Sequence, residues 1–494
     1  MTRGKTMRRF LAFGAAFGMA LALSVAPSAH AATVTDPRAY ADAVRRLTAP
    51  PSTVALPELG PGPTDALLEV VNAHRLGLGL RPALPPLSAT QVQALVAIPQ
   101  PYAGRVAALL HTILACPPGG GTACATATND ALVAVLRTPA PGFGDVDLWP
   151  TLHIDGDGGS DTYRHDYVVS IDRGGNDTYD NNAGGNLVDV QRGPTGSGAL
   201  FEANAVGCEQ AQGIASSPVN NYYDCISMPQ VALLDYRAFG SSNDTYGVLK
   251  SPRTRDHHVP PGGVPRAVDG DCTNSSLVRR IVLEGSGFEG NGLLLDVDGN
   301  DRYRGKTAAQ GSAHVSGVGV LRDLGRGSDS YLAIRNSQGF SLFGQLGVLQ
   351  DDGGNDRYST YMPRKKIPSA PFQSPGSGGV IDDTGHCDDM PRMVQGSALL
   401  GGLGFLTDED GRDIYEGAPA GTQPFAPQVE FFHSSQGFGC SGGAGVLRDT
   451  GRDRDTYREG PGRTDGMSVR QAQRPCKPSA PGLSVFLDDG PPRR

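Results

Sequence analysis

Hydrophobic residues recur at fixed distances from glycine and aspartate in the stretch from Gln310 to Tyr358. It reads QGSAHVSGVGVLRDLGRGSDSY and then, after a short gap, QGFSLFGQLGVLQDDGGNDRY, and the two copies align almost residue for residue. Gln310 and Gln338 are 28 residues apart, and so are Tyr303 and Tyr331. A fixed period of this length is typical of repeat architectures, in which each unit buries its apolar face only against its neighbours.

Each copy divides into three short segments that glycines separate: Gly-Val-Leu-x-Asp, Asp-x-Tyr, and the residues after Gln-Gly. The apolar runs are too short for helices, so we expect strands and a mainly β fold. The pattern predicts a parallel β-solenoid of about 28 residues per coil, with like residues stacked ~4.8 Å apart. A β-propeller is the alternative, because spacings of 41 and 42 residues near the C-terminus approach a blade length. If the coils stack in this way, Val320, Val348, Phe405 and Val446 fill the core. We also expect the side-chain amides of Gln310, Gln338, Gln395 and Gln436 to form a ladder.

The Asp-x-Tyr element extends this β domain over residues 150–494. Two stretches, 183–232 and 248–289, interrupt the pattern, and we expect them to be loops across one face. The element recurs at Tyr163, Tyr179, Tyr246, Tyr303, Tyr331, Tyr358, Tyr415 and Tyr457. Matched tyrosines could stack on sugar rings if exposed, but a ladder at coil spacing is more often packing.

Helical periodicity characterises residues 32–140. Asp36-Pro37 is a helix start, a second helix begins near Thr64, and Ser88 to Gln91 form a capping box. Two further apolar segments run from about 102 to 114 and from 126 to 136. We expect a small helical domain that caps the open end of the solenoid, joined to it by a linker at 141–149.

Residues 1–31 have the pattern of a signal peptide. A basic start precedes the apolar run Phe10 to Val25, and Ala29-His30-Ala31 is a small-x-small cleavage site. We therefore expect a secreted, extracellular protein that begins at Ala32 and has no membrane span. The formal charge of −8 argues against nucleic acid as a partner.

Eight cysteines in an exported chain predict disulfide bonds. Cys116 with Cys124 and Cys208 with Cys225 each bracket a short loop, so we expect each pair to close locally. Cys440 with Cys476 is a plausible third pair, which leaves Cys272 and Cys387 by elimination.

Aspartate clusters in the glycine turns, as in the runs Gly174 to Tyr179 and Gly353 to Tyr358. These turns resemble the Gly/Asp repeats of RTX proteins, extracellular modules in which glycine-rich turns hold calcium in a parallel β-roll. The resemblance is limited to the turns, and it implies calcium as a ligand. Carboxylate and carbonyl oxygens are the ligand set that calcium takes. The alternative is that each aspartate caps its own turn through hydrogen bonds to the backbone. The candidate ligands are Asp172, Asp177, Asp296, Asp298, Asp301, Asp323, Asp329, Asp351, Asp356, Asp408, Asp410 and Asp413, and the turns DVDGND and DEDGRD are expected to bind most tightly.

No catalytic motif is recognisable, so the catalytic residues are unknown. The first hypothesis is a calcium-stabilised scaffold or binding protein without catalytic activity, with an extracellular carbohydrate or cell-surface component as its partner. The second is an extracellular polysaccharide-degrading enzyme on a β-solenoid, with Arg253, Arg255, Asp256 and His257 in the second insertion as its candidate set. A transition-metal site at His257 and His258, or at His153 with Asp155 and Asp157, is a weaker alternative than solvated surface.

Overall fold

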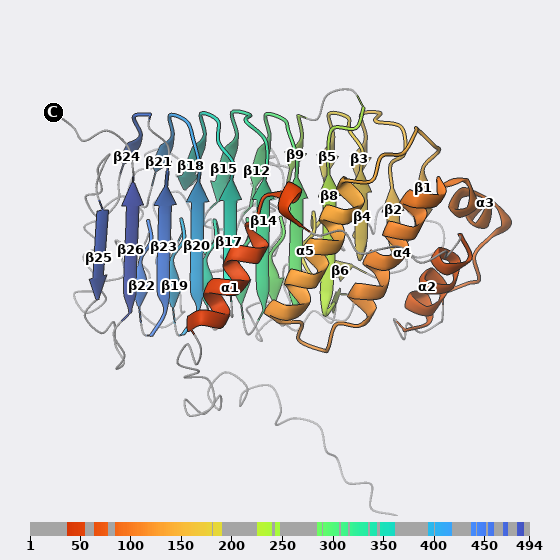
Figure 1. Ribbon diagram of the computed structural model, residues 1–494, viewed down its shortest axis with the longest axis horizontal. Helices are drawn as coiled ribbons and strands as arrows, with labels where there is room; N and C mark the ends of the chain where they lie inside the picture. Colours follow the sequence, from red (N-terminus) through yellow and green to blue (C-terminus); the bar gives the residue numbers. More distant parts are fainter. Residues whose placement is uncertain are drawn as a thin grey trace, which may run out of the picture.

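The computed structural model has its helices first and its strands afterwards (Figure 1). It describes residues 37–54, 64–77, 84–179, 181–189, 225–239, 243–247, 284–288, 290–305, 308–314, 317–333, 336–342, 346–360, 394–399, 401–416, 436–440, 442–450, 453–458, 468–472 and 482–488. The fold is mainly β, with long parallel sheets and, in the described residues, five α-helices. This arrangement is compatible with a solenoid-like fold, and the described strands form no closed barrel or propeller.

The helices lie between residues 37 and 136, where the apolar periodicity predicts them. Ser88 and Gln91 form the expected capping box, because each side chain accepts a hydrogen bond from the other residue's backbone N–H. The helices are α1 (Pro37–Leu47), a 3-10 turn η1 (Pro51–Thr53), α2 (Thr64–Gly77), α3 (Ala89–Ala97), α4 (Gln100–Leu114) and α5 (Thr122–Leu136).

Three sheets run along the molecule, and each regular repeat, which we call a coil, contributes one strand to each. The 11-stranded sheet has the order β1 (Val146–Leu148), β2 (Leu152–Ile154), β4 (Val169–Asp172), β8 (Gln230–Asp235), β11 (Asn291–Asp296), β14 (Val318–Asp323), β17 (Leu346–Asp351), β20 (Leu403–Asp408), β23 (Ala444–Asp449), β26 (Leu483–Asp488) and β25 (Ser468–Ala472). Strands β2 to β26 of this order are parallel, whereas β1 and β25 pair antiparallel at the two edges.

The other two sheets carry the remaining repeat elements. The 8-stranded sheet contains the tyrosines, in the order β24 (Thr456–Arg458), β21 (Ile414–Glu416), β18 (Arg357–Thr360), β15 (Ser330–Ala333), β12 (Arg302–Arg304), β9 (Thr245–Tyr246), β5 (Thr178–Tyr179) and β3 (Thr162–Tyr163). The 5-stranded sheet follows the Gln-Gly corners, in the order β10 (Gly287–Phe288), β13 (Ala313–His314), β16 (Ser341–Leu342), β19 (Ala398–Leu399) and β22 (Gly439–Cys440). Within the stretches predicted as loop insertions, β6 (Leu187–Asp189) pairs with β7 (Cys225–Ser227), and β8 and β10 begin coils.

The Gln-Gly corner turns because two successive residues have positive φ. Gln310 has φ 56° and Gly311 φ 70°. A Cβ on Gly311 would lie 1.9 Å from the carbonyl oxygen of Val348, so only glycine fits there. The stacked glutamines form no amide-to-amide ladder, because the amide nitrogen of Gln310 donates to the backbone carbonyls of Tyr303 and Leu332 instead. The corners at Gln310, Gln338 and Gln395 therefore each bond one coil to the next.

The 11-stranded sheet buries apolar side chains on both faces. Leu321 and Leu349 face the coil interior, where they pack with the tyrosines. Val320 and Val348 point the other way and pack with the helices. The prediction of core positions is therefore confirmed for Val320 and Val348, which lie in the core between the sheet and the helices and not inside the coils. Phe405 and Val446 are only half-buried, since they lie towards the end of the sheet that the helices leave open.

Polar side chains of the sheet join it to the helical layer in front (Figure 1). Arg322 is fully buried, and its guanidinium donates to the carbonyl of Ala49, just after α1, and to the side chain of Asn129 in α5. On the next strand, the amide of Gln350 donates to the carbonyl of Thr48. The helices are thus fixed to the sheet by specific hydrogen bonds as well as by apolar packing.

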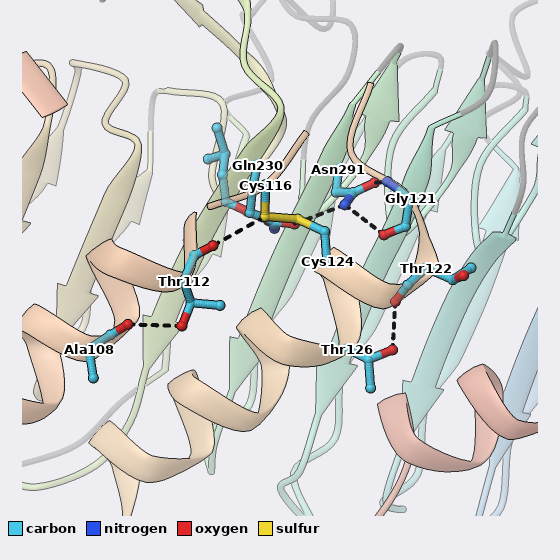
Figure 2. Close-up of a disulfide and its surroundings, with 10 residues drawn as sticks. Ala108, Thr112, Cys116, Gly121, Thr122, Cys124, Thr126, Gln230 and Asn291 are labelled. Carbon is cyan, nitrogen blue, oxygen red and sulfur yellow. Dashed lines mark hydrogen bonds between the residues drawn. A yellow bond between two sulfur atoms is a disulfide. The ribbon is translucent and has the colours of Figure 1, made fainter. Parts of the chain in front are cut away.

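A disulfide joins Cys116 and Cys124 between α4 and α5, as the sequence predicted (Figure 2). The loop it closes contacts the sheet, because Asn291 of β11 accepts a hydrogen bond from the N–H of Gly121 at 2.9 Å and donates to its carbonyl at 3.0 Å. The other predicted pairs, Cys208–Cys225 and Cys440–Cys476, together with Cys272 and Cys387, involve side chains outside the described residues.

Candidate metal centre

A row of buried aspartates follows the carboxyl ends of the strands in the 11-stranded sheet. Parallel pairing places Asp296, Asp323, Asp351 and Asp408 side by side in register. These strand-end aspartates point into the coil interior, and all are at most 1% exposed. Like residues in neighbouring parallel strands lie ~4.8 Å apart, so the fold brings carboxyl groups together that are distant in sequence.

The tyrosines of the 8-stranded sheet stack beside this row. Ring centroids of Tyr303, Tyr331 and Tyr358 are 4.7 Å apart with nearly parallel planes. Each hydroxyl lies between two strand-end aspartates. That of Tyr331 is 3.2 Å from Oδ2 of Asp323, in its own coil, and 2.7 Å from Oδ2 of Asp351, in the next. The buried ladder is therefore a packing and hydrogen-bonding element, and its rings are not available to stack on sugars.

A second aspartate in each coil lies in the turn, two residues before the tyrosine. Oδ1 of Asp329 accepts a hydrogen bond from the backbone N–H of Asp301 in the preceding coil, and Asp356 does the same for Asp329. Oδ2 of these turn aspartates has no hydrogen-bond partner, although the residues are at most 3% exposed. Buried polar atoms are rarely left without a partner, so these oxygens indicate that a proton or a cation belongs there.

The two kinds of aspartate meet in trios. Each trio joins one turn aspartate to the strand-end aspartates of two consecutive coils, with three ligand oxygens that all lie within 4.8 Å of one another. Four of the trios found among the described residues are fully buried: Asp235, Asp244 and Asp296; Asp296, Asp301 and Asp323; Asp323, Asp329 and Asp351; and Asp351, Asp356 and Asp408. These groups could hold metal ions.

Burial and mutual repulsion make ionisation of this row costly in the absence of a cation. Burial, followed by the charge of Asp323, raises the pKa of Asp301 to about 11 and that of Asp351 to about 7. The salt bridges found among the described residues include no carboxyl group of the four buried trios. Within the described residues, the charge of these trios is therefore not balanced by a salt bridge.

Most of the predicted ligands belong to this row, but their grouping differs from the prediction. Within DVDGND, Asp296 and Asp301 are buried in a trio, whereas the side chain of Asp298 is 52% exposed and pairs with Arg237. Asp410 of DEDGRD is likewise exposed. Asp172, Asp177 and Asp413 are buried along the same row, and Asp323, Asp329, Asp351, Asp356 and Asp408 lie in the trios.

Turn capping, the alternative explanation, also occurs. Oδ1 of Asp323 accepts from the N–H of Gly325, and Oδ1 of Asp351 accepts from that of Gly353. These bonds use one oxygen of a strand-end aspartate. Oδ1 of Asp296 and of Asp408 has no partner. Capping therefore accounts for only part of the row's carboxylate oxygens.

Sequence reasoning missed two trio members, Asp235 and Asp244. Both occupy repeat positions: Asp235 ends β8, and Asp244 precedes Thr245-Tyr246. The Asp-x-Tyr signal could have found Asp244. A further trio of Asp145, Asp155 and Asp157 lies at the start of the β domain, where Asp145 and Asp157 are exposed. The ring of His153 there lies 5.1 Å from the rings of Tyr163 and Tyr167.

A separate buried acid replaces glutamine at one corner. Glu284 has φ 55° and precedes Gly285, like Gln310 and Gly311 in the next coil. Its Oε1 accepts a hydrogen bond from the N–H of Arg304 at 2.7 Å, and its Oε2 has no partner. Burial raises the pKa of Glu284 to about 8.

No family model, curated protein or solved structure matches this chain. In the part of the chain that the structure describes, no helix is long and apolar enough to cross a membrane.

Proposed function

We propose that this chain is a secreted β-solenoid that acts as a rigid scaffold or binding protein without catalytic activity, and that calcium stabilises its interior. Three features support the proposal: the signal-peptide pattern of residues 1–31, the in-register parallel strands, and the buried carboxylate trios. The trios are the strongest of these features, because buried carboxylates repeated in every coil need a cation or protons to neutralise their charge.

The electrostatics of the row support a bound cation. Two carboxylates ~5 Å apart repel each other by about 3 kcal/mol at an effective dielectric constant of 20, and every coil adds to this. A cation between them would replace repulsion by attraction without moving the coils. Calcium is the expected cation because the trios offer only oxygen donors, the ligand type that calcium prefers.

The sharing of aspartates limits how many trios can fill. Asp323 belongs to two neighbouring trios, and so does Asp351. Two divalent cations one coil apart would repel each other strongly. We therefore expect calcium to occupy alternate trios, so that two neighbouring trios that share an aspartate are not filled together.

The test is to unfold the full chain in guanidinium with EDTA and to refold it with EDTA or with calcium. Calcium should raise the melting temperature, since a ligand that binds only the folded state stabilises it, and elemental analysis should find calcium bound to the refolded chain. At a concentration of about 100 Kd the gain is about 2.7 kcal/mol.

Asp329→Asn is the informative variant, because an asparagine keeps the Oδ1 that accepts from Asp301 while removing the charge from its trio. It should reduce the difference in melting temperature between calcium and EDTA. Asp298→Asn is the matched control: it removes the same charge from an exposed residue outside the four buried trios, which acts on Asp323 only through its charge, and it should change that difference much less than Asp329→Asn does. If EDTA and calcium give the same melting temperature, the row is neutralised by protons and the calcium proposal is wrong.

The absence of catalysis requires its own test. The residues of the alternative enzyme hypothesis, Arg253, Arg255, Asp256 and His257, lie outside the described part of the chain. A panel of soluble polysaccharides incubated with the secreted protein, with reducing ends measured over time, should show no turnover. Steady release from any of them would replace the scaffold proposal by the enzyme hypothesis.

A further inference from the structure

The outward face of the last coils is apolar and open. On β14 and β17 the outward residues Val318, Val320, Leu346 and Val348 are at most 1% exposed beneath the helices. Among the described residues, no helix crosses β23 or β26, which lie beyond α1 in the same sheet (Figure 1). There Leu483 is 46% exposed and the other outward apolar side chains are partly exposed. We call Ala444, Val446, Leu483, Val485 and Leu487 the C-terminal apolar patch.

The strand register relates this patch to the part of the face that already binds helices. Arg322, which donates to the carbonyl of Ala49 just after α1, aligns through Gln350 and Thr407 with Arg448 of β23. Arg448 is exposed. Thr407 lies at the same register position on β20, between the strands of Arg322 and Arg448, and its Oγ1 is buried without a hydrogen-bond partner. The open coils thus repeat both the apolar positions and the basic group that hold α1 in place.

We propose that the C-terminal apolar patch docks an amphipathic α-helix of a partner protein, with the last carbonyls of that helix at Arg448. The patch continues the face that α1, α4 and α5 already occupy. The two strands of the patch, each of six residues, span about 10 Å by about 20 Å, which fits one helix of about 10–12 Å diameter. This area, about 200 Å², is far below the roughly 800 Å² per partner of a stable dimer, so a second copy fits the patch poorly. This surface is independent of the cation row.

The probe is the helix that this face binds in its own chain. We use a fluorescent peptide of residues 37–50 in which Arg46→Lys introduces an amine that forms a lactam with the side chain of Asp42. Asp42 and Arg46 are both exposed in the protein, so the bridge leaves the apolar side of the helix free. The bridge is needed because so short a helix is otherwise marginal in water. Fluorescence anisotropy with the full chain should show saturable binding, and a scrambled peptide should not bind.

Variants of the patch locate the binding. Leu483→Asp and Val446→Asp should each weaken the peptide about tenfold, because each loses an apolar contact. Arg448→Ala should weaken it about threefold through the lost carbonyl bond. Arg302→Ala is the control, because Arg302 is an equally exposed strand arginine in the 8-stranded sheet. Circular dichroism of each variant confirms that it is folded.

Three outcomes would overturn the proposal. The first is absent peptide binding, or binding that these variants leave unchanged. The second is a concentration-dependent dimer in light scattering that Val446→Asp abolishes, which would make a second copy the occupant. The third is a photocrosslink from Leu483→p-benzoylphenylalanine to residues before Pro37 of the same chain, which would make that segment the occupant.

Discussion

Glu284 offers the clearest quantitative test of how this fold treats buried charge. Four other corners carry glutamine at its position, each followed by glycine with positive φ: Gln310, Gln338, Gln395 and Gln436. Glu284→Gln therefore introduces the residue that the repeat itself uses. The new amide could donate to backbone carbonyls, as that of Gln310 does, where the carboxylate only accepts.

The magnitude follows from the linkage between protonation and folding. Burial raises the pKa of Glu284 from 4.5 to about 8, so the folded state favours the neutral acid. The stabilising effect of that proton is complete below pH 4.5 and is lost as the pH rises through about 8. At 1.36 kcal/mol per pKa unit, the loss is about 3 kcal/mol at pH 7 and about 5 kcal/mol above pH 8. Glu284→Gln removes this loss.

The assay is urea denaturation followed by circular dichroism at pH 5 and pH 8.5, with the divalent cation concentration held constant. The variant should unfold at nearly the same urea concentration as the parent at pH 5 and at a clearly higher one at pH 8.5. Gln338→Glu is the reciprocal control and should create a new loss of stability over the same pH range. If Glu284→Gln increases the free energy of unfolding equally at both pH values, the stabilisation does not come from removing a buried charge.

Two further predictions concern the interior and the disulfide. Tyr331→Phe should lower the free energy of unfolding by about 1–3 kcal/mol, because it removes the hydroxyl between Asp323 and Asp351. Tyr167→Phe is the control: the hydroxyl of Tyr167 bonds the exposed Asp147, so its loss should lower the free energy of unfolding less in the same denaturation experiment. Reduction of Cys116–Cys124 should lower stability by about 2.5 kcal/mol, the loop-closure entropy of so short a loop; an unchanged melting temperature in reductant would mean that the contacts of Gly121 with Asn291 alone hold the loop.

The sequence predicted the repeat, the strand segments and the helices well because each depends on local patterns. The coil elements around Gln310 and Gln338 appear as three strands apiece, and the capping box at Ser88 starts α3. The disulfide at Cys116 depends on short spacing alone. The Glu284 corner was missed because an acid replaces the glutamine that defined the motif.

The direction in which strand residues point could not be predicted from the pattern. In VGVLRD of β14, Val320 and Leu321 are both apolar and both buried, one beneath the helices and one in the interior. Alternation identifies the core face only when the other face is polar. The grouping of aspartates failed for a related reason: trios form between coils, so spacing within the DVDGND turn carries no information about them.

The buried polar row resolves the ambiguity that the apolar residues leave. Shifting β14 by one residue would exchange Val320 and Leu321 at little cost in apolar burial, but it would turn Asp323 out of the interior and separate it from the hydroxyls of Tyr303 and Tyr331. Buried polar groups are costly when unpaired, so only one register of each coil keeps every tyrosine between two aspartates. We infer that the aspartates and tyrosines fix the register of the stack, and that neutralising the row is the cost of that specificity. The aspartates that need a cation or a proton to neutralise their charge thus also keep the coils in register.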